Sequence, residues 1–206
     1  VAIGTGAVAS AAAGIAIGEL AQALTGARAV AIGKSAASGT DSLAAAIANN
    51  TSSYGATGAN SVAIGKRAKA TDGTSTAIGQ DAVASNGGFA FGVSSVASAS
   101  GSVALGGPSV ADKVGKLSFT GRSLSGTGQT QAGMIVLMSD TTDATPEALT
   151  SNNSTASTTN QVILPNNSAY AFHGTIVARQ KASAGTASAA WKVEGLIRRE
   201  GSAGTT

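Results

Sequence analysis

The sequence predicts an all-β chain in two parts, a parallel β-solenoid followed by an antiparallel β module. Three observations predict this fold. A four-residue phrase of the type Val-Ala-Ile-Gly recurs through the first half of the 206 residues. Residues that favour tight turns separate the copies. After about residue 112 the recurrence stops, and longer segments with alternating apolar residues replace it.

The recurring phrase defines the solenoid, which we expect to span residues 1–112. Seven copies end in a glycine: Gly4, Gly18, Gly33, Gly65, Gly79, Gly92 and Gly106. An eighth copy is expected at residues 45–48, with Ala48 in the glycine position. The copies are 13 to 17 residues apart, which is too short for a helical pair or a propeller blade. This spacing fits one coil of a β-solenoid, with two short strands and two turns.

A second, weaker strand is expected after each glycine, as at residues 82–85. Gly, Ser, Thr, Asn and Asp lie between the strands, as at residues 71–74, and they tolerate the positive φ angles of tight turns. Helix is the rival interpretation, because alanine is the best helix former. It fails because the recurring glycine, with Val and Ile beside it, breaks every candidate helix.

Side chains alternate between the two faces of each strand. Val30 and Ile32 therefore share a bulky aliphatic face, while Ala31 belongs to a smooth face that lets another surface approach closely. The apolar area that one coil can bury falls short of the entropy cost of ordering its residues. We therefore expect a single column of coils to need further copies of itself, arranged with closed rotational symmetry.

Residues 61–70 and 75–84 resemble the head repeat of trimeric autotransporter adhesins, the family of the Yersinia adhesin. The resemblance covers residues 1 to about 111. It implies a left-handed parallel β-roll, an obligate homotrimer and a rigid surface-displaying element without catalytic residues. Residues 34–60 depart from the pattern, since the copies there are longer, and a loop or bulge is expected among them.

Residues 113–206 predict an antiparallel β-sandwich or jelly-roll-like module. Strands are expected at residues 116–122, 134–138, 161–164, 169–179 and 189–198, with a polar loop at 139–160. The run at 134–138 is apolar throughout and is expected to be a central strand. Because most of the chain's large aromatic and methionine side chains lie in this part, we expect a conventional hydrophobic core.

Residues 160–172, 175–179 and 189–199 are similar to a β-rich module near the C-terminus of tailed-phage fibre and other virion proteins. In those relatives the module continues through further strands. We therefore expect the second domain to be incomplete at its C-terminal end and the chain to be part of a longer polypeptide. The resemblance implies a place in a virion tail fibre, next to other tail or baseplate proteins.

The composition excludes several kinds of site. The chain has no cysteine, so it forms neither disulfides nor thiolate metal sites. No apolar run approaches the 18 residues of a membrane helix. The 28 glycines and 11% of charged residues are typical of a fibrous repeat. No cofactor or metal site is predicted.

Candidate catalytic residues are few. His173 is the only histidine, so a Ser-His-Asp triad would require it, and we expect it on the surface or at a trimer contact. Residues 33–35 look like the end of a phosphate-binding loop, but Arg28 stands where that motif needs a glycine. The sequence therefore predicts a protein that is not an enzyme.

Three carboxylates in the polar loop could in principle form the acid pair of a glycan-cleaving site. They are Asp140, Asp143 and Glu147. Their spacing indicates no more than a solvated turn. Asp72 and Asp81 lie in expected solenoid turns, where short polar side chains are usual.

Basic residues cluster at Lys66, Arg67 and Lys69, and again at Arg198 and Arg199. Neither cluster has the broad stripe with interleaved aromatic residues that nucleic-acid binding requires. The first cluster is a candidate contact for an anionic host-surface glycan or lipopolysaccharide, as a ring of charge around a trimer. The alternative is a solvated edge that discourages strand pairing.

These observations predict a non-catalytic structural fibre component of a tailed-phage virion, a homotrimer that displays or forms a host-adhesion surface. One alternative is the head of a bacterial trimeric adhesin on the outer surface of a cell. A second is a fragment of a glycan-cleaving tailspike. No nucleic-acid partner is expected.

Overall fold

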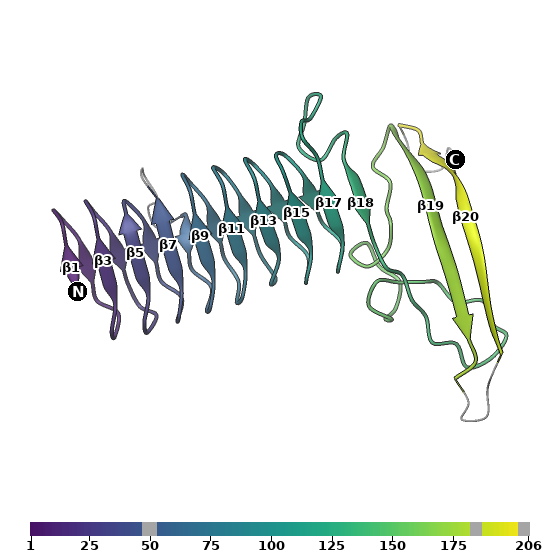
Figure 1. Cartoon of the computed structure of the whole chain (residues 1–206), viewed down its shortest axis with the longest axis horizontal. Coiled ribbons are helices and arrows are strands. Elements are labelled where there is room, and N and C mark those ends of the chain that lie inside the picture. Colours follow the sequence, from purple (N-terminus) through teal and green to yellow (C-terminus); the bar gives the residue numbers. More distant parts are fainter. Residues whose placement is uncertain (47–52, 182–186, 202–206) are drawn as a thin grey trace. The chain divides into compact units, whose positions relative to one another are not determined.

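The computed structural model describes residues 1–46, 53–181 and 187–201, and these residues contain strands and turns but no helix (Figure 1). The chain divides into two compact units, Val1–Gln161 and Val162–Thr206. The first unit contains a parallel β-solenoid of about eight turns, and the second contains an antiparallel two-stranded sheet. The predicted all-β class and both types of sheet are therefore confirmed.

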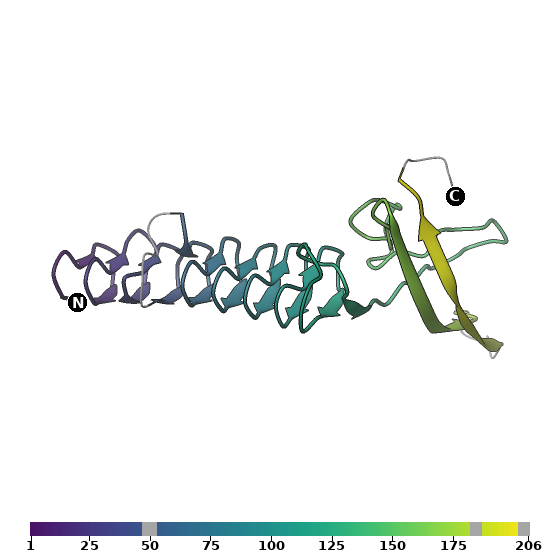
Figure 2. The same cartoon turned by 90° about the horizontal axis from the view of Figure 1, so that it is seen from above.

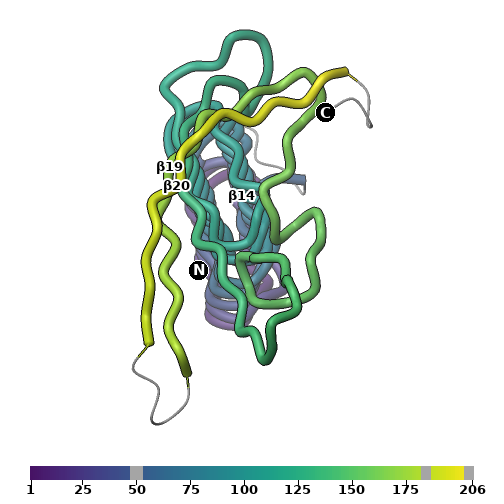
Figure 3. The backbone as a smooth tube through the Cα atoms, turned by 90° about the vertical axis from the view of Figure 1, so that its right-hand side faces the viewer, coloured from purple at the N-terminus to yellow at the C-terminus, as the bar shows by residue number. Residues whose placement is uncertain are grey.

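The solenoid consists of two parallel rows of short strands, which we call sheet A and sheet B (Figure 2). The parallel strands of sheet A are β1 (Ala2–Ile3), β3 (Ile15–Ile17), β5 (Val30–Gly33), β7 (Leu43–Ala46), β9 (Val62–Ile64), β11 (Thr76–Ile78), β13 (Phe89–Phe91), β15 (Val103–Leu105) and β17 (Leu117–Phe119). The strands of sheet B are β2 (Val8–Ala9), β4 (Gln22–Ala23), β6 (Ala36–Ala37), β8 (Gly55–Ala56), β10 (Lys69–Ala70), β12 (Val83–Ala84), β14 (Val96–Ala97) and β16 (Val110–Ala111). Each coil contributes one strand to each sheet, and successive coils superpose when viewed along the solenoid (Figure 3).

The smooth alanine face points into the coil. In sheet A, Ala63 lies opposite Ala77, which lies opposite Ala90, and all three are completely buried. In sheet B, Ala70 and Ala84 form the same stack and are also completely buried. The surface that approaches the alanine face is thus the other sheet of the same coil. Because this interior is filled almost entirely by methyl groups, the larger aliphatic side chains of the phrase point outward.

Buried serines complete the interior at the corners of the coils. Ser61 Oγ donates a hydrogen bond of 2.6 Å to the carbonyl oxygen of Gly58, three residues earlier. Ser95 Oγ donates in the same way to Gly92, at 3.0 Å. A hydroxyl that bonds locally in this way can be buried without loss of a hydrogen bond.

The phrase-ending glycines are required by the turn from sheet A to sheet B, which we call the first turn. Gly79 has φ +131°, and a Cβ there would lie 2.5 Å from the carbonyl oxygen of Gly92 in the next coil. All seven glycines predicted from the repeat have positive φ, between +74° and +137°. Glycine is therefore needed both for the backbone angle and for the close stacking of coils.

The fourth coil differs from its predicted alignment. The strand β7 places Ala44 opposite Ala31 and Ala46 opposite Gly33, so Ala46 occupies the glycine position. The prediction of Ala48 there was wrong by two residues, because the buried alanine column fixes the register at Ala44. Ala48 and the expected loop around it include residues outside the described ranges.

The solenoid also continues beyond the predicted boundary at residue 112. The strand β17 pairs in parallel with β15, so it is the ninth strand of sheet A and does not belong to the second module. The next strand, β18 (Ala132–Met134), pairs with it in the antiparallel direction. Met134 is 70% exposed, so the predicted buried central strand at residues 134–138 is wrong. A boundary at 112 thus divides coils that stack on one another.

The last strand of sheet B is capped by a side chain. Gln131 Nε2 donates to the carbonyl oxygen of Val110 at 3.1 Å, and Gln131 Oε1 accepts from the amide of Val110 at 2.9 Å. The carboxamide therefore reproduces both hydrogen bonds that a further strand would make to β16. This pairing protects an edge that would otherwise be open to strand addition.

A long polar loop follows β18, as predicted, and Asn160 organises it. Asn160 is 1% exposed, and its carboxamide bonds to Asn152, Ser154, Thr155 and Ser157. Since every polar atom of this buried side chain has a partner, it holds the loop without an unsatisfied group.

The second unit is a long hairpin of β19 (Ser168–Arg179) and β20 (Ser188–Arg199), which confirms two of the predicted strands. No strand forms at residues 161–164, and none of the described residues in 162–201 is buried. The second unit therefore does not contain the predicted sandwich with a conventional core. Two strands enclose no interior, so their apolar side chains remain on the surface.

The glycine requirement can be tested by a matched pair of substitutions. Gly79→Ala should destabilise the fold by more than about 3 kcal/mol, because it combines a backbone clash with a φ angle that is nearly exclusive to glycine. Gly101→Ala should cost only about 1 kcal/mol, because Gly101 has φ +61° and a Cβ there meets nothing within 4 Å. Chemical denaturation at one protein concentration measures both. Equal losses would contradict the role assigned to coil stacking.

Candidate interaction surfaces

The outer face of sheet A is an apolar stripe. It consists of the side chains on either side of each buried alanine, as in Val62 and Ile64 around Ala63. Large members that are at least 36% exposed are Ile3, Ile15, Ile17, Ile32, Ile64, Phe89, Leu105 and Phe119. The strand register aligns them in two columns. Thr76 is the one polar residue that β1 to β15 place in these columns.

The size of this apolar stripe is unusual for a surface left in water. Nine strands at ~4.8 Å spacing extend it over about 40 Å. Contiguous apolar patches of this length mark protein–protein interfaces. The narrow alanine interior leaves these side chains no other place to be buried. The stripe is therefore the principal candidate interaction surface of the solenoid.

The outer face of sheet B is different, since each two-residue strand presents only one side chain outward. Lys69 lies there between Gly55 and Val83 in the register. Gln22 occupies the corresponding position in β4, opposite Val8 and Ala36. This face is narrower, and Gln22 and Lys69 are its polar members beside four valines, Val8, Val83, Val96 and Val110, so it presents less apolar area than the outer face of sheet A.

Two ion pairs link successive coils at the turns. Arg67 pairs through Nε and Nη2 with both carboxylate oxygens of Asp81, one coil further on. Arg28 pairs in the same bidentate manner with Asp41, on the opposite edge of the coil. The hydrogen bonds from Arg67 hold the pKa of Asp81 below its ordinary value, and those from Arg28 do the same for Asp41. Each pair therefore fastens two coils most firmly when its aspartate is ionised.

The predicted basic cluster is distributed over two surfaces. Lys66 is exposed in the first turn, while Arg67 beside it is engaged by Asp81. Lys69 points outward from sheet B, because its neighbour Ala70 is buried. The two lysines thus project from the turn and from the sheet, and Arg67 has a structural contact that the sequence did not predict.

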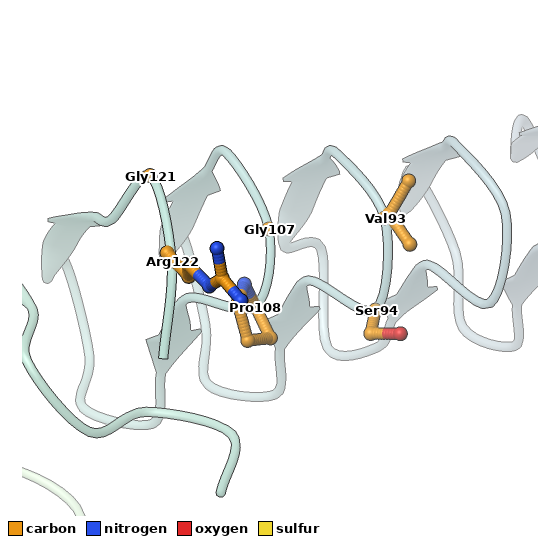
Figure 4. Close-up of a pocket in the computed structure, with 6 residues that line it drawn as sticks. All are labelled: Val93, Ser94, Gly107, Pro108, Gly121 and Arg122. Carbon is orange, nitrogen blue, oxygen red and sulfur yellow. The ribbon is translucent and has the colours of Figure 1, made fainter. Parts of the chain in front are cut away.

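A shallow hollow of about 370 Å³ lies along the first turns of the last coils (Figure 4). It is lined by Val93, Ser94, Gly107, Pro108, Gly121 and Arg122. Figure 4 shows the Arg122 side chain directed toward Pro108. The hollow exists because glycines stand at turn positions that carry long side chains in earlier coils, such as Lys66 and Gln80. Sequence reasoning missed it, although the change in turn composition was visible.

The structure assembles no catalytic group from the predicted candidates. His173 lies opposite Glu194 on the exposed polar face of the hairpin. In the polar loop, Glu147 accepts a hydrogen bond from Ser139, and Asp143 accepts one from the amide of Thr145, which lowers the pKa of Asp143. All three loop carboxylates are exposed, and those of Asp143 and Glu147 are bonded to neighbours in the loop.

Neither a metal site nor a membrane helix is found in the part of the chain that the structure describes. No three His, Asp or Glu side chains there are grouped so as to hold a metal ion. In the same residues, no helix is long and apolar enough to span a membrane.

Comparison with known proteins identifies the solenoid repeats. Residues 56–82 and 85–107 match two copies of the YadA head domain repeat. No curated protein matches the chain. The matched residues cover the coils from β8 to β15, where alanine stacks on alanine in both sheets. The chain is therefore a β-solenoid protein with adhesin-head-like repeats, which supports an adhesive role.

The ion pairs predict a specific pH dependence. Asp81→Asn should lower the melting temperature at pH 7 by about 2 °C, because a partly exposed ion pair contributes little. Since the folded-state pKa of Asp81 is lowered, its contribution is present above the ordinary pKa of aspartate and is lost as the pH falls through the folded value. Asparagine also tolerates the positive φ of position 81.

Thermal melts of the native chain and of Asp81→Asn over a pH series measure this effect. The difference between the two should vanish at acidic pH. A difference that stays constant down to pH 2 would show that the carboxylate charge is not its origin.

Proposed function

We propose that the chain is a non-catalytic structural fibre protein of a tailed-phage virion, which assembles as a homotrimer and displays a host-adhesion surface. The observation that carries this proposal is the uncovered apolar stripe of sheet A. A stripe that runs along every coil is covered most simply by the same stripe of parallel copies. The adhesin-head-like repeats favour three copies, in line with the trimeric family that they resemble.

The adhesive surface then consists of the parts that remain outside such an assembly. These are the outer face of sheet B and the turns, which include Lys66, Lys69 and the hollow beside Arg122. Lysine and arginine groups suit an anionic host glycan or lipopolysaccharide. Three identical copies would raise the apparent affinity for a repetitive surface without a deep pocket in any one copy.

The assignment to a virion rests on the resemblance of residues 160–199 to phage fibre modules. Within that segment two of the three predicted strands form, as β19 and β20, and the one predicted at residues 161–164 does not. Other tail or baseplate proteins are then the neighbours of the fibre. The second candidate is the head of a bacterial trimeric surface adhesin, which the YadA head domain repeats favour.

Immunogold electron microscopy tests the location. Antibodies raised against the chain should label the tails of phage particles in a sample whose DNA encodes this chain. Labelling confined to bacterial cell surfaces would overturn the virion assignment and favour the adhesin.

The role of the apolar stripe predicts a position-dependent effect of charge. Ile64→Asp should lower the melting temperature by more than about 10 °C, because it places an unpaired carboxylate in the contact between copies. Val83→Asp, on the outer face of sheet B, should lower it by no more than about 3 °C. Equal losses would contradict burial of the sheet A face between copies.

The glycan contact predicts a loss of binding without loss of fold. Lys66→Ala combined with Lys69→Ala should weaken binding to immobilised host lipopolysaccharide at least tenfold, through the loss of two charges from each copy. Lys192→Ala, in the hairpin, is the matched control and should bind as the native chain does. Unchanged binding of the double variant, or release of reducing sugar by the native chain, would contradict the proposed non-catalytic contact.

A further inference from the structure

The hairpin of the second unit has one largely apolar face. The antiparallel register places Tyr170 opposite Ile197, and Phe172 opposite Gly195. On the same face, Gly174 lies opposite Val193 and Ile176 opposite Trp191. We call this the aromatic face and define it by these residues: Tyr170, Phe172, Gly174, Ile176, Trp191, Val193, Gly195 and Ile197. These eight residues carry no charge, and the next pair on the same side of the hairpin is Ser168 opposite Arg199, which is charged.

The opposite face carries most of the charged groups of the hairpin, together with the exposed side chains of Val177 and Leu196. His173 lies opposite Glu194, and Thr175 opposite Lys192. At its ends Arg179 and Arg198 belong to the same face. The hairpin is therefore amphipathic across its thickness, as a strand pair is when one face is buried in an assembly and the other meets water.

None of the described residues of the second unit covers the aromatic face. Trp191 is 52% exposed, Phe172 43% and Ile176 41%. The described residues of the second unit form no third strand, and none of them is buried. A single two-stranded hairpin is at best marginally stable in water. The face therefore requires a partner for the hairpin to be stable.

The largest side chains of the aromatic face include one, Phe172, that is held in place within the hairpin itself. The Phe172 ring lies over Gly195, since a Cβ on that glycine would lie 3.1 Å from the Cε1 and Cζ atoms of the ring. An aromatic ring over a cross-strand glycine fixes the ring and fills the gap in the sheet. A partner would thus pay little entropy to immobilise this side chain.

We propose that the aromatic face packs against the same face of the other copies in the assembly, so that the hairpins form a second apolar contact in addition to that of sheet A. This inference rests on the proposed homotrimer. Parallel copies keep their hairpins within reach of one another, because only residues 162–167 lie between the first unit and β19. The eight residues of the aromatic face are uncharged, so they meet without repulsion, while Arg199 on the same side lies at the end of the hairpin and donates to the carbonyl oxygen of Leu164.

The size of the face favours tethered copies over a free partner. The aromatic face spans seven residues of each strand, and at ~3.4 Å per residue over a width of ~10 Å these give roughly 240 Å² per hairpin. A stable interface between free proteins buries about 800 Å² on each partner. Copies that are already held together by sheet A need less buried area for this contact, since tethering provides an effective concentration in the millimolar range. The face is thus too small to recruit a separate protein tightly and large enough to join copies of this chain.

Disulfide trapping tests the contact directly, because the native chain has no cysteine. Single substitutions Gly174→Cys, Ile176→Cys and Val193→Cys place a thiol on the aromatic face. Thr175→Cys, on the polar face of the same strand, is the matched control. After mild oxidation of the full chain, at least one aromatic-face variant should give at least tenfold more crosslinked chain pairs than Thr175→Cys does on a non-reducing gel. If none exceeds the control, the proposal is overturned.

Fluorescence of Trp191 is an independent measurement, since it is the only tryptophan in the chain. In the native assembly its emission should be blue-shifted, and acrylamide should quench it several-fold less than in the same protein in denaturant. A native mass measurement on the same sample separates the two proposals. A trimer with a freely quenched Trp191 would overturn the hairpin contact alone, and a monomer would overturn the trimer and the hairpin contact together.

Discussion

The close approach of the two sheets within each coil is the constraint on which the structure depends. Ala63, Ala77 and their equivalents are completely buried, and the interior accepts little beyond a methyl or hydroxyl group. The turn that joins the two sheets also requires the positive φ of the phrase-ending glycines, and at these glycines one coil lies directly against the next. A core of this kind buries little apolar area per residue, so the solenoid gains less from its interior than an ordinary domain does.

The same constraint places the large aliphatic side chains on the outside. In the solenoid, Ile64 and Leu105 lie on the outer face of sheet A, and in the hairpin Phe172 and Trp191 lie on an uncovered face. Both units therefore have an amphipathic sheet with the apolar side in contact with solvent in a single copy. In the proposed assembly both apolar faces are buried, because the copies provide one another's hydrophobic core.

The sequence predicted the solenoid well because every coil repeats the same information. Gly79 and Ala77 recur in register, and period, strand and turn can be read from them. Prediction failed where that information is absent. Ala46 has no glycine to mark its position, and Leu117 begins a coil whose interior residue is Ser118 in place of alanine. The sandwich core was expected from composition alone, which cannot say whether apolar side chains face their own chain or another.

The pairing of Arg67 with Asp81 and the carboxamide cap of Gln131 could not be predicted for a related reason. Each depends on which side chains become neighbours when coils stack, and Gln131 reaches a strand 21 positions earlier. Local patterns determine the coil, but contacts between a coil and a non-repeating segment depend on the three-dimensional path of the chain. The same holds for the hollow at Arg122, which arises from side chains that are missing from successive turns.

The most direct test of the central claim is the native mass of the chain in solution. If the outward apolar stripe is buried between copies, the mass will be three times the chain mass of 19.6 kDa and will stay constant on dilution. A monomer of 19.6 kDa that unfolds cooperatively at an ordinary melting temperature would contradict the account.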